Sequence, residues 1–213
     1  MIDLKSIMSI PNSDLQGAAQ ALDKSDIPQL VEWLALKDDD IRYKAFLLLQ
    51  SRSTLYNDVY PFWDTFREKL SSDNSYQRSI GLMLIAENVR WDAENHMEDI
   101  IDEYLACLKD EKPVTIRQCI QSLGKIASIK PELNNSIASA LISFDIMAVK
   151  ETMRKSILSD ILNVLLIIRQ EYKTDEIESF IFTALSGEIL DKRQRNKSKR
   201  VCAAVNLCRT DVI

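Results

Sequence analysis

The sequence predicts an all-α protein built from a series of helical hairpins. Three observations favour this class. Glycine and proline are scarce, with 4 and 5 residues among 213, whereas a β-sandwich needs many Gly/Pro-rich turns and a dinucleotide-binding fold needs glycines at its phosphate turn. Apolar residues recur with the period of a helix along most of the chain. Strict alternation over the length of a strand appears nowhere.

The composition bounds the class of protein further. Hydrophobic residues make up 46% of the chain and charged residues 28%, which is the balance of a folded domain and argues against disorder. The first residues lack a basic region followed by an apolar stretch, so we expect no signal peptide. The longest apolar-rich run, 161–168, is far shorter than the roughly 20 residues of a membrane span. We therefore expect a cytoplasmic protein without membrane contact.

Apolar stripes locate the individual helices. One stripe consists of Met97, Ile100, Ile101, Tyr104, Leu105 and Leu108, which share one helical face. The predicted helices cover 13–22, 26–36, 39–51, 57–70, 75–90, 94–109, 113–129, 131–142, 148–171, 175–187 and 192–208. Pro28, Pro61, Pro113 and Pro131 each lie near the start of such a segment, where the missing N–H of proline costs nothing. Short links between these helices predict antiparallel neighbours.

A sequence pattern repeats at the start of every second helix. An Arg is followed three positions later by a small or aliphatic residue, and by another aliphatic residue about one turn further on. The pattern occurs at Arg42, Arg78, Arg117, Arg154 and Arg200, with spacings of 36, 39, 37 and 46 residues. In the unit of Arg154, Asp160 breaks the third position. A drifting period of about 40 residues with two helices per unit is typical of HEAT and armadillo arrays.

These repeats predict an α-α superhelix, a solenoid of the HEAT/armadillo type with about five helical hairpins. The expected hairpins cover 26–51, 57–90, 94–129, 131–171 and 175–208, after a lead-in of residues 1–25. The whole chain, 1–213, is expected to form a single repeat domain, because an isolated pair of helices cannot bury its apolar face.

The chain resembles HEAT-repeat proteins over most of its length. The segments 74–78, 90–92 and 110–119 resemble more particularly a group of small bacterial HEAT-like proteins that are loosely labelled SufBD-related. That label implies iron–sulfur assembly, but a scaffold of that kind would be a β-helix, whereas this sequence is helical throughout. By analogy of fold, the resemblance implies a curved stack of helices that binds another protein.

Sequence motifs for catalysis or metal binding are missing. The chain has one histidine, His96, and four cysteines, none of them in a C-x-x-C pair: Cys107, Cys119, Cys202 and Cys208. Zinc needs about four ligands at close spacing, so we interpret the cysteines as buried apolar residues in a reducing compartment and His96 as a surface residue. Neither a nucleophile elbow nor a phosphate-binding loop is present. We therefore expect no catalytic residue, no metal, no cofactor and no enzyme activity.

Trp91 and Asp92 allow one enzymatic alternative. HEAT-like DNA glycosylases gather aromatic and acidic residues over a lesion on a basic face, which this pair resembles superficially. However, the neighbouring sequence is strongly acidic and would repel a phosphate backbone. The structural interpretation has Trp91 filling the joint between two repeats and Asp92 capping the helix that follows.

The exposed side of the second helices provides the candidate binding surface. Candidates with polar or charged side chains are Arg78, Arg117, Gln118, Gln121 and Lys125. The alternative for the arginines is an internal row of ion pairs with acidic residues. Asp39, Asp73 and Asp110 lie close before Arg42, Arg78 and Arg117, which favours the internal row.

Charge is unevenly distributed along the chain. The net charge of −5 divides into +5 for residues 189–213 and −10 for the remainder. The acidic body predicts a protein partner with a basic surface. The basic residues at Lys192, Arg193, Arg195, Lys197, Lys199 and Arg200 leave open the alternative of a nucleic-acid-associated factor. The partner's identity and the oligomeric state are left open by the sequence.

Overall fold

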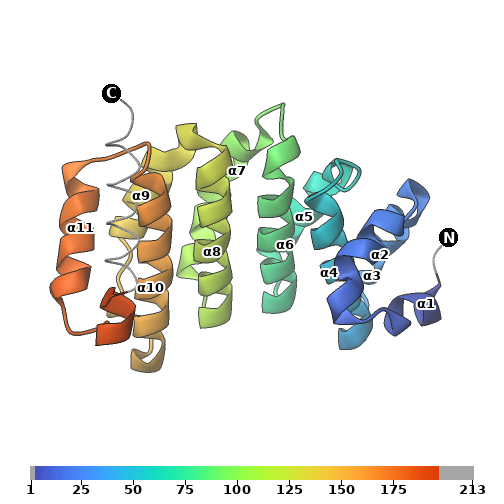
Figure 1. Cartoon of the computed structure of the whole chain (residues 1–213), viewed down its shortest axis with the longest axis horizontal. Coiled ribbons are helices and arrows are strands. Elements are labelled where there is room, and N and C mark those ends of the chain that lie inside the picture. The colour runs from blue at the N-terminus through green and yellow to red at the C-terminus, as the bar shows by residue number, and fades with distance from the viewer. Residues whose placement is uncertain (1–2, 197–213) are drawn as a thin grey trace. The chain divides into compact units, whose positions relative to one another are not determined.

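The computed structural model describes residues 3–196, apart from the side chain of Asn12 (Figure 1). Within this range every regular element is a helix or a 3-10 turn and no strand occurs, which confirms the all-α class. The chain divides into two compact units, Met1–Tyr104 and Leu105–Ile213. We describe each unit by itself.

The first unit is organised around α4 and α6. It contains α1 (Leu4–Ser9), α2 (Leu15–Ala21), α3 (Ile27–Trp33), α4 (Asp39–Ser53), α5 (Trp63–Glu68), α6 (Ser75–Asn88) and most of α7 (His96–Ala106). Helix α4 packs on α1, α2, α3 and α6, and α6 packs on α5. Leu48, Phe66, Leu84 and Tyr104 are completely buried between these helices.

Helix α1 was not predicted from the sequence. Asp3 caps it by accepting hydrogen bonds from the backbone N–H groups of Lys5 and Ser6, at 2.9 and 3.1 Å. Ile7 is fully buried and attaches the helix to the unit. Six residues are too few to show a helical period, so this lead-in segment could be recognised only from its packing on α4.

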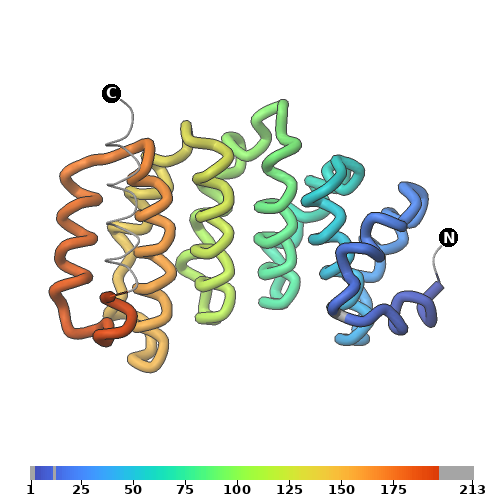
Figure 2. Tube along the Cα trace, viewed as in Figure 1, coloured from blue at the N-terminus to red at the C-terminus, as the bar shows by residue number. Residues whose placement is uncertain are grey.

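The second unit is organised around α10. Its helices are α8 (Pro113–Ile129), α9 (Asn134–Ile142), α10 (Glu151–Ile168) and α11 (Asp175–Ser186). Figure 2 shows α8 and α10 running side by side, and α10 also contacts α9 and α11. Contact with three helices explains why α10 is apolar on most of its circumference. Residues 192–196 are helical as well, and the rest of the predicted helix 192–208 lies outside the described residues.

Helix boundaries agree well with the sequence where the end signals are strong. The predicted helix 113–129 has the same limits as α8, whose first residue is Pro113. Proline also lies in the first turn of α3 and of the 3-10 turns at 60–62 and 131–133. The predicted helix 57–70 is shorter, because only Trp63–Glu68 is α-helical and both flanks are 3-10 turns.

The ion pair of Arg169 and Glu178 connects the end of α10 to α11 and makes stability depend on pH. Arg169 Nη2 donates to Glu178 Oε2 at 3.0 Å. This hydrogen bonding lowers the pKa of Glu178 below its ordinary value of 4.5, against the opposing effect of partial burial. Because the pKa is lower in the folded state, the carboxylate stabilises the fold above pH 4.5. That contribution is lost as the pH falls through the folded-state pKa.

We therefore expect Glu178→Gln to reduce the free energy of unfolding at neutral pH but to have little effect in strong acid. Urea denaturation over a series of pH values measures this difference. The exposed Glu171→Gln serves as the control for loss of one carboxylate, and its stability should follow the wild type at every pH. A constant difference between wild type and Glu178→Gln from neutral to acid pH would contradict the role given to the ion pair.

Candidate functional site

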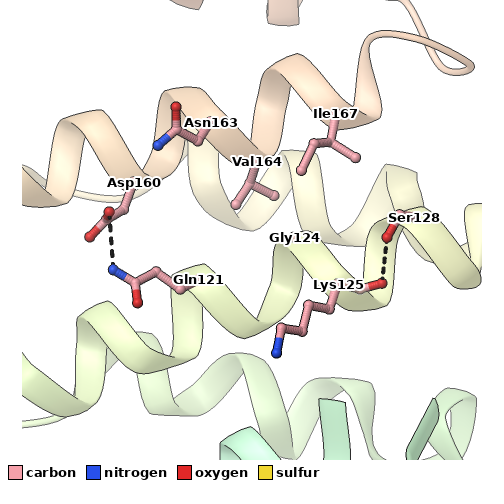
Figure 3. A pocket seen from close by; sticks show the side chains of 8 residues that line it. All are labelled: Gln121, Gly124, Lys125, Ser128, Asp160, Asn163, Val164 and Ile167. Atoms are coloured by element: carbon pink, nitrogen blue, oxygen red, sulfur yellow. Dashed lines mark hydrogen bonds between the residues drawn. The ribbon is translucent and has the colours of Figure 1, made fainter. Parts of the chain in front are cut away.

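The exposed face of α8 borders a pocket in the second unit. Gln121, Lys125 and Ser128 are exposed on this helix, and their spacing of four and three residues places them on one face. The pocket lies between this face and α10 and has a volume of about 310 Å³. Figure 3 shows the side chains that line it: Gln121, Gly124, Lys125, Ser128, Asp160, Asn163, Val164 and Ile167.

One end of the pocket is held by a polar network around Asp160. Its carboxylate accepts hydrogen bonds from Arg117 Nε at 2.7 Å and from Gln121 Nε2 at 3.2 Å. The Asp160 side chain is only 10% exposed, whereas that of Arg117 is 35% exposed. Two candidate binding residues, Arg117 and Gln121, are thus brought together by an acidic residue of the next inner helix. The guanidinium compensates the charge of the carboxylate at this end of the pocket.

The floor of the pocket is apolar and owes its depth to Gly124. A β-carbon at this position would lie 3.4 Å from Val164 Cγ2 and 3.5 Å from Ile167 Cδ1. Those are ordinary contact distances, so the glycine leaves room for about a methyl group. Asn163 is exposed at the rim, and the Ser128 hydroxyl donates to the carbonyl of Lys125 at 2.8 Å. Amide and hydroxyl groups therefore surround an apolar depression.

The repeat arginines mostly bond to the loop before their own helix. Arg42 Nη1 donates to the carbonyl of Leu36 at 3.0 Å, and Arg42 pairs with Asp39 as expected. Arg78 Nη1 donates to the carbonyl of Ser72 at 2.7 Å and to that of Asp73 at 3.1 Å.

The two repeat arginines of the second unit differ from each other. Arg154 Nε donates to the carbonyl of Val149 at 3.1 Å, again in the loop before its own helix. Arg117 differs, because its guanidinium pairs with Asp160 of α10. The nearby Asp110 was the carboxylate that the sequence suggested for Arg117. Gln118 is half-buried on α8 and does not line the pocket.

Asp92 is a buried residue that caps the start of α7. Its side chain is fully buried and accepts hydrogen bonds from the backbone N–H groups of His96 and Met97 at 2.9 and 3.0 Å, which confirms the predicted cap of α7. The Tyr60 hydroxyl also donates to Asp92, at 2.8 Å. Burial, and then this hydrogen bond, raise the pKa of the Tyr60 phenol. Trp91 Nε1 donates to the carbonyl of Ser53 at 2.7 Å, which ties the turn before α7 to the end of α4.

The described cysteines are packed in the interior of the second unit. Cys107 and Cys119 are both buried and carry free thiols, and burial raises the pKa of the Cys119 thiol. Between residues 3 and 196 no group of three or more His, Cys, Asp or Glu side chains is arranged to hold a metal ion. Cys202 and Cys208 lie outside the described residues.

The basic segment is described only in its first half. Lys192 and Arg193 are exposed, and Arg195 Nη1 lies 3.5 Å from the carbonyl of Gly187, to which it donates. Lys197, Lys199 and Arg200 lie outside the described residues. In the part of the chain that the structure describes, no helix combines the length and apolar character needed to cross a membrane.

Comparison with known proteins gives information on the fold alone. No protein-family model matches the chain, and no curated protein matches it. Among solved structures, 34 chains match. One of these is the crystal structure of an engineered protein from the Northeast Structural Genomics Consortium, with 15% identity and a TM-score of 0.61 over 96% of this chain and 87% of the other. At an identity this low, the match shows similarity of fold alone, and the fold class is all-helical.

Proposed function

We propose that this chain is a HEAT-like helical-repeat protein that works without catalysis, by binding another protein in the cytoplasm. Three of the repeat arginines, Arg42, Arg78 and Arg154, each bond to the loop before their own helix. This recurring arrangement supports a solenoid of repeated units. Free buried thiols at Cys107 and Cys119 suit a reducing compartment. The step from architecture to protein binding is an analogy of fold.

The α8–α10 pocket is the observation that carries the proposal. Its apolar floor of Val164 and Ile167 suits one apolar side chain, and its polar rim suits the peptide groups on either side of that side chain. Arg117 compensates the charge of Asp160 at one end of the pocket, and Lys125 adds a cation to the lining. An extended segment of a partner protein, with one apolar residue in the pocket, fits this arrangement best.

Two other functions have weaker support. Binding of nucleic acid would depend on the basic segment that begins at Lys192, in a chain whose remaining residues are strongly acidic. A glycosylase would need an accessible carboxylate at Asp92, but the acceptor positions of this buried group are directed to the start of α7 and to Tyr60. The partner-binding proposal needs neither group.

Affinity capture from native lysate, with and without nuclease, tests the proposal. The tagged wild-type chain is compared with Asn163→Tyr, whose ring would cover the pocket from its exposed rim. The matched control is Gln16→Tyr, on the exposed face of α2. We expect a protein that is captured by wild type and control after nuclease treatment and is lost with Asn163→Tyr.

A further arm addresses the nucleic-acid alternative. In it, the six basic residues from Lys192 to Arg200 are replaced by Gln or Ser. Capture of nucleic acid that disappears with these replacements would move the function to the basic segment. Capture of the same proteins by wild type and Asn163→Tyr would remove the pocket from the proposal.

A further inference from the structure

The first unit carries an exposed apolar strip on α4 and α6. Tyr43 of α4 is 58% exposed and Tyr76 of α6 is 67% exposed. Leu47, one turn after Tyr43, and Met83, two turns after Tyr76, are half-buried, and these spacings place each pair on one face of its helix. Tyrosine is enriched at the centres of protein interfaces.

Contacts between α4 and α6 hold this tyrosine strip in place. At one end, the Arg42 guanidinium lies over the Tyr76 ring, with its central carbon 5.5 Å from the ring centroid. At the other end, Gln50 Nε2 donates to Glu87 Oε1 at 3.1 Å. Because Arg42 is itself fixed by the carbonyl of Leu36, the Tyr76 ring is oriented before any partner arrives. A preoriented ring loses little conformational entropy on binding.

The charge at the N-terminal end of the strip is negative. Asp38 and Asp40 are exposed before Tyr43, and Asp73 is exposed before Tyr76, whereas Asp39 pairs with Arg42. Within the described segments 36–43 and 72–76, Lys37 is the one exposed cation, because Arg42 is buried against Tyr76. Carboxylates beside exposed phenol rings favour a cationic ligand by charge complementarity. The Tyr43 ring adds an aromatic face that can attract a cation, whereas one face of Tyr76 already holds Arg42.

We propose that the tyrosine strip on α4 and α6 docks a basic segment of a partner protein, with Lys or Arg at the acidic end and apolar side chains over Tyr43, Tyr76 and Met83. This surface lies in the first unit, so the inference is independent of the α8–α10 pocket. The acidic groups disfavour nucleic acid as the occupant, although exposed rings can stack on bases.

Selection from a displayed library of random peptides against the purified full chain tests this proposal without presupposing a sequence. We expect the enriched peptides to combine Lys or Arg with large apolar residues. Their affinities are then measured by fluorescence anisotropy. The double variant Tyr43→Ser/Tyr76→Ser should bind them at least about tenfold more weakly, while Tyr43→Phe/Tyr76→Phe should retain most of the affinity because the rings remain.

The control is Phe182→Ser, which removes a 73% exposed aromatic residue from α11 in the second unit and should leave binding unchanged. Circular dichroism confirms that each variant is folded. Failure to enrich basic apolar peptides, or equal affinity of the Tyr→Ser variant, overturns the proposal. So does tighter binding of a single-stranded oligonucleotide that depends on the two tyrosines.

Discussion

Replacing Arg52 by Ala should lower the free energy of unfolding by about 3–5 kcal/mol, because it leaves a buried carboxylate without its partner. The side chains of Arg52 and Asp58 are each 7% exposed. Arg52 Nη2 donates to Asp58 at 2.6 Å and Nε donates to it at 3.1 Å. Arg52 Nη1 also donates to the carbonyl of Ala19 at 2.9 Å, so one guanidinium joins α2, α4 and the loop after α4.

The control for this prediction is Arg67→Ala. Arg67 pairs with Glu103 at 2.8 Å, but their side chains are 46% and 38% exposed, and an exposed pair contributes at most about 1 kcal/mol. Urea denaturation of both variants measures the difference. Arg52→Lys should also be destabilised, because an ammonium group cannot reproduce the forked hydrogen bonds. Equal effects of Arg52→Ala and Arg67→Ala would contradict the importance assigned to burial.

Gly81→Ala should destabilise the first unit by about 2 kcal/mol, even though alanine favours helices. A β-carbon on Gly81 would lie 2.6 Å from the carbonyl oxygen of Phe66 and 3.0 Å from Lys69 Cβ. The first of these atoms belongs to the backbone, so α6 must move away from α5 to admit a methyl group. The strain of such overpacking, about 1–3 kcal/mol or more, exceeds the roughly 1 kcal/mol gained in helix propensity.

Gly124→Ala provides the matched control in the second unit. Both glycines lie in the interior of a long helix, but at Gly124 the added carbon makes only ordinary contacts with Val164 and Ile167. We expect this variant to be as stable as the wild type, or more stable by up to about 1 kcal/mol. Thermal denaturation of the two variants compares them directly. Stabilisation by both substitutions would show that α6 and α5 are not in close contact at Gly81.

Two residues of the pocket lining, Gln121 and Lys125, were named from the sequence, but the assembly of the pocket could not be predicted. The helical period identified α8, and with it the exposed positions Gln121 and Lys125. Asp160 was visible only as a break in the repeat pattern. Its role depends on Arg117, 43 residues earlier in the chain. An acidic residue at an otherwise aliphatic position of an inner helix was the signal that could have revealed this pair.

The tyrosine strip was not recognised in the sequence for a similar reason. Tyr43 and Tyr76 belong to different helices, and an isolated tyrosine is as common in a core as on a surface. Their exposure follows from how far α4 and α6 are rotated about their axes. The contact of Arg42 with Tyr76 needs both helices in place.

The sequence by itself determined the class and the local structure of this protein. Apolar spacing, prolines in first turns and the cap at Asp92 act within one helix or its first turn, and the geometry of a helix is the same in every fold. Only the tertiary structure decided the tight contact at Gly81, the open floor at Gly124 and the pairing of Arg117 with Asp160. Those features depend on distances between helices, which are set by many side chains packing at once.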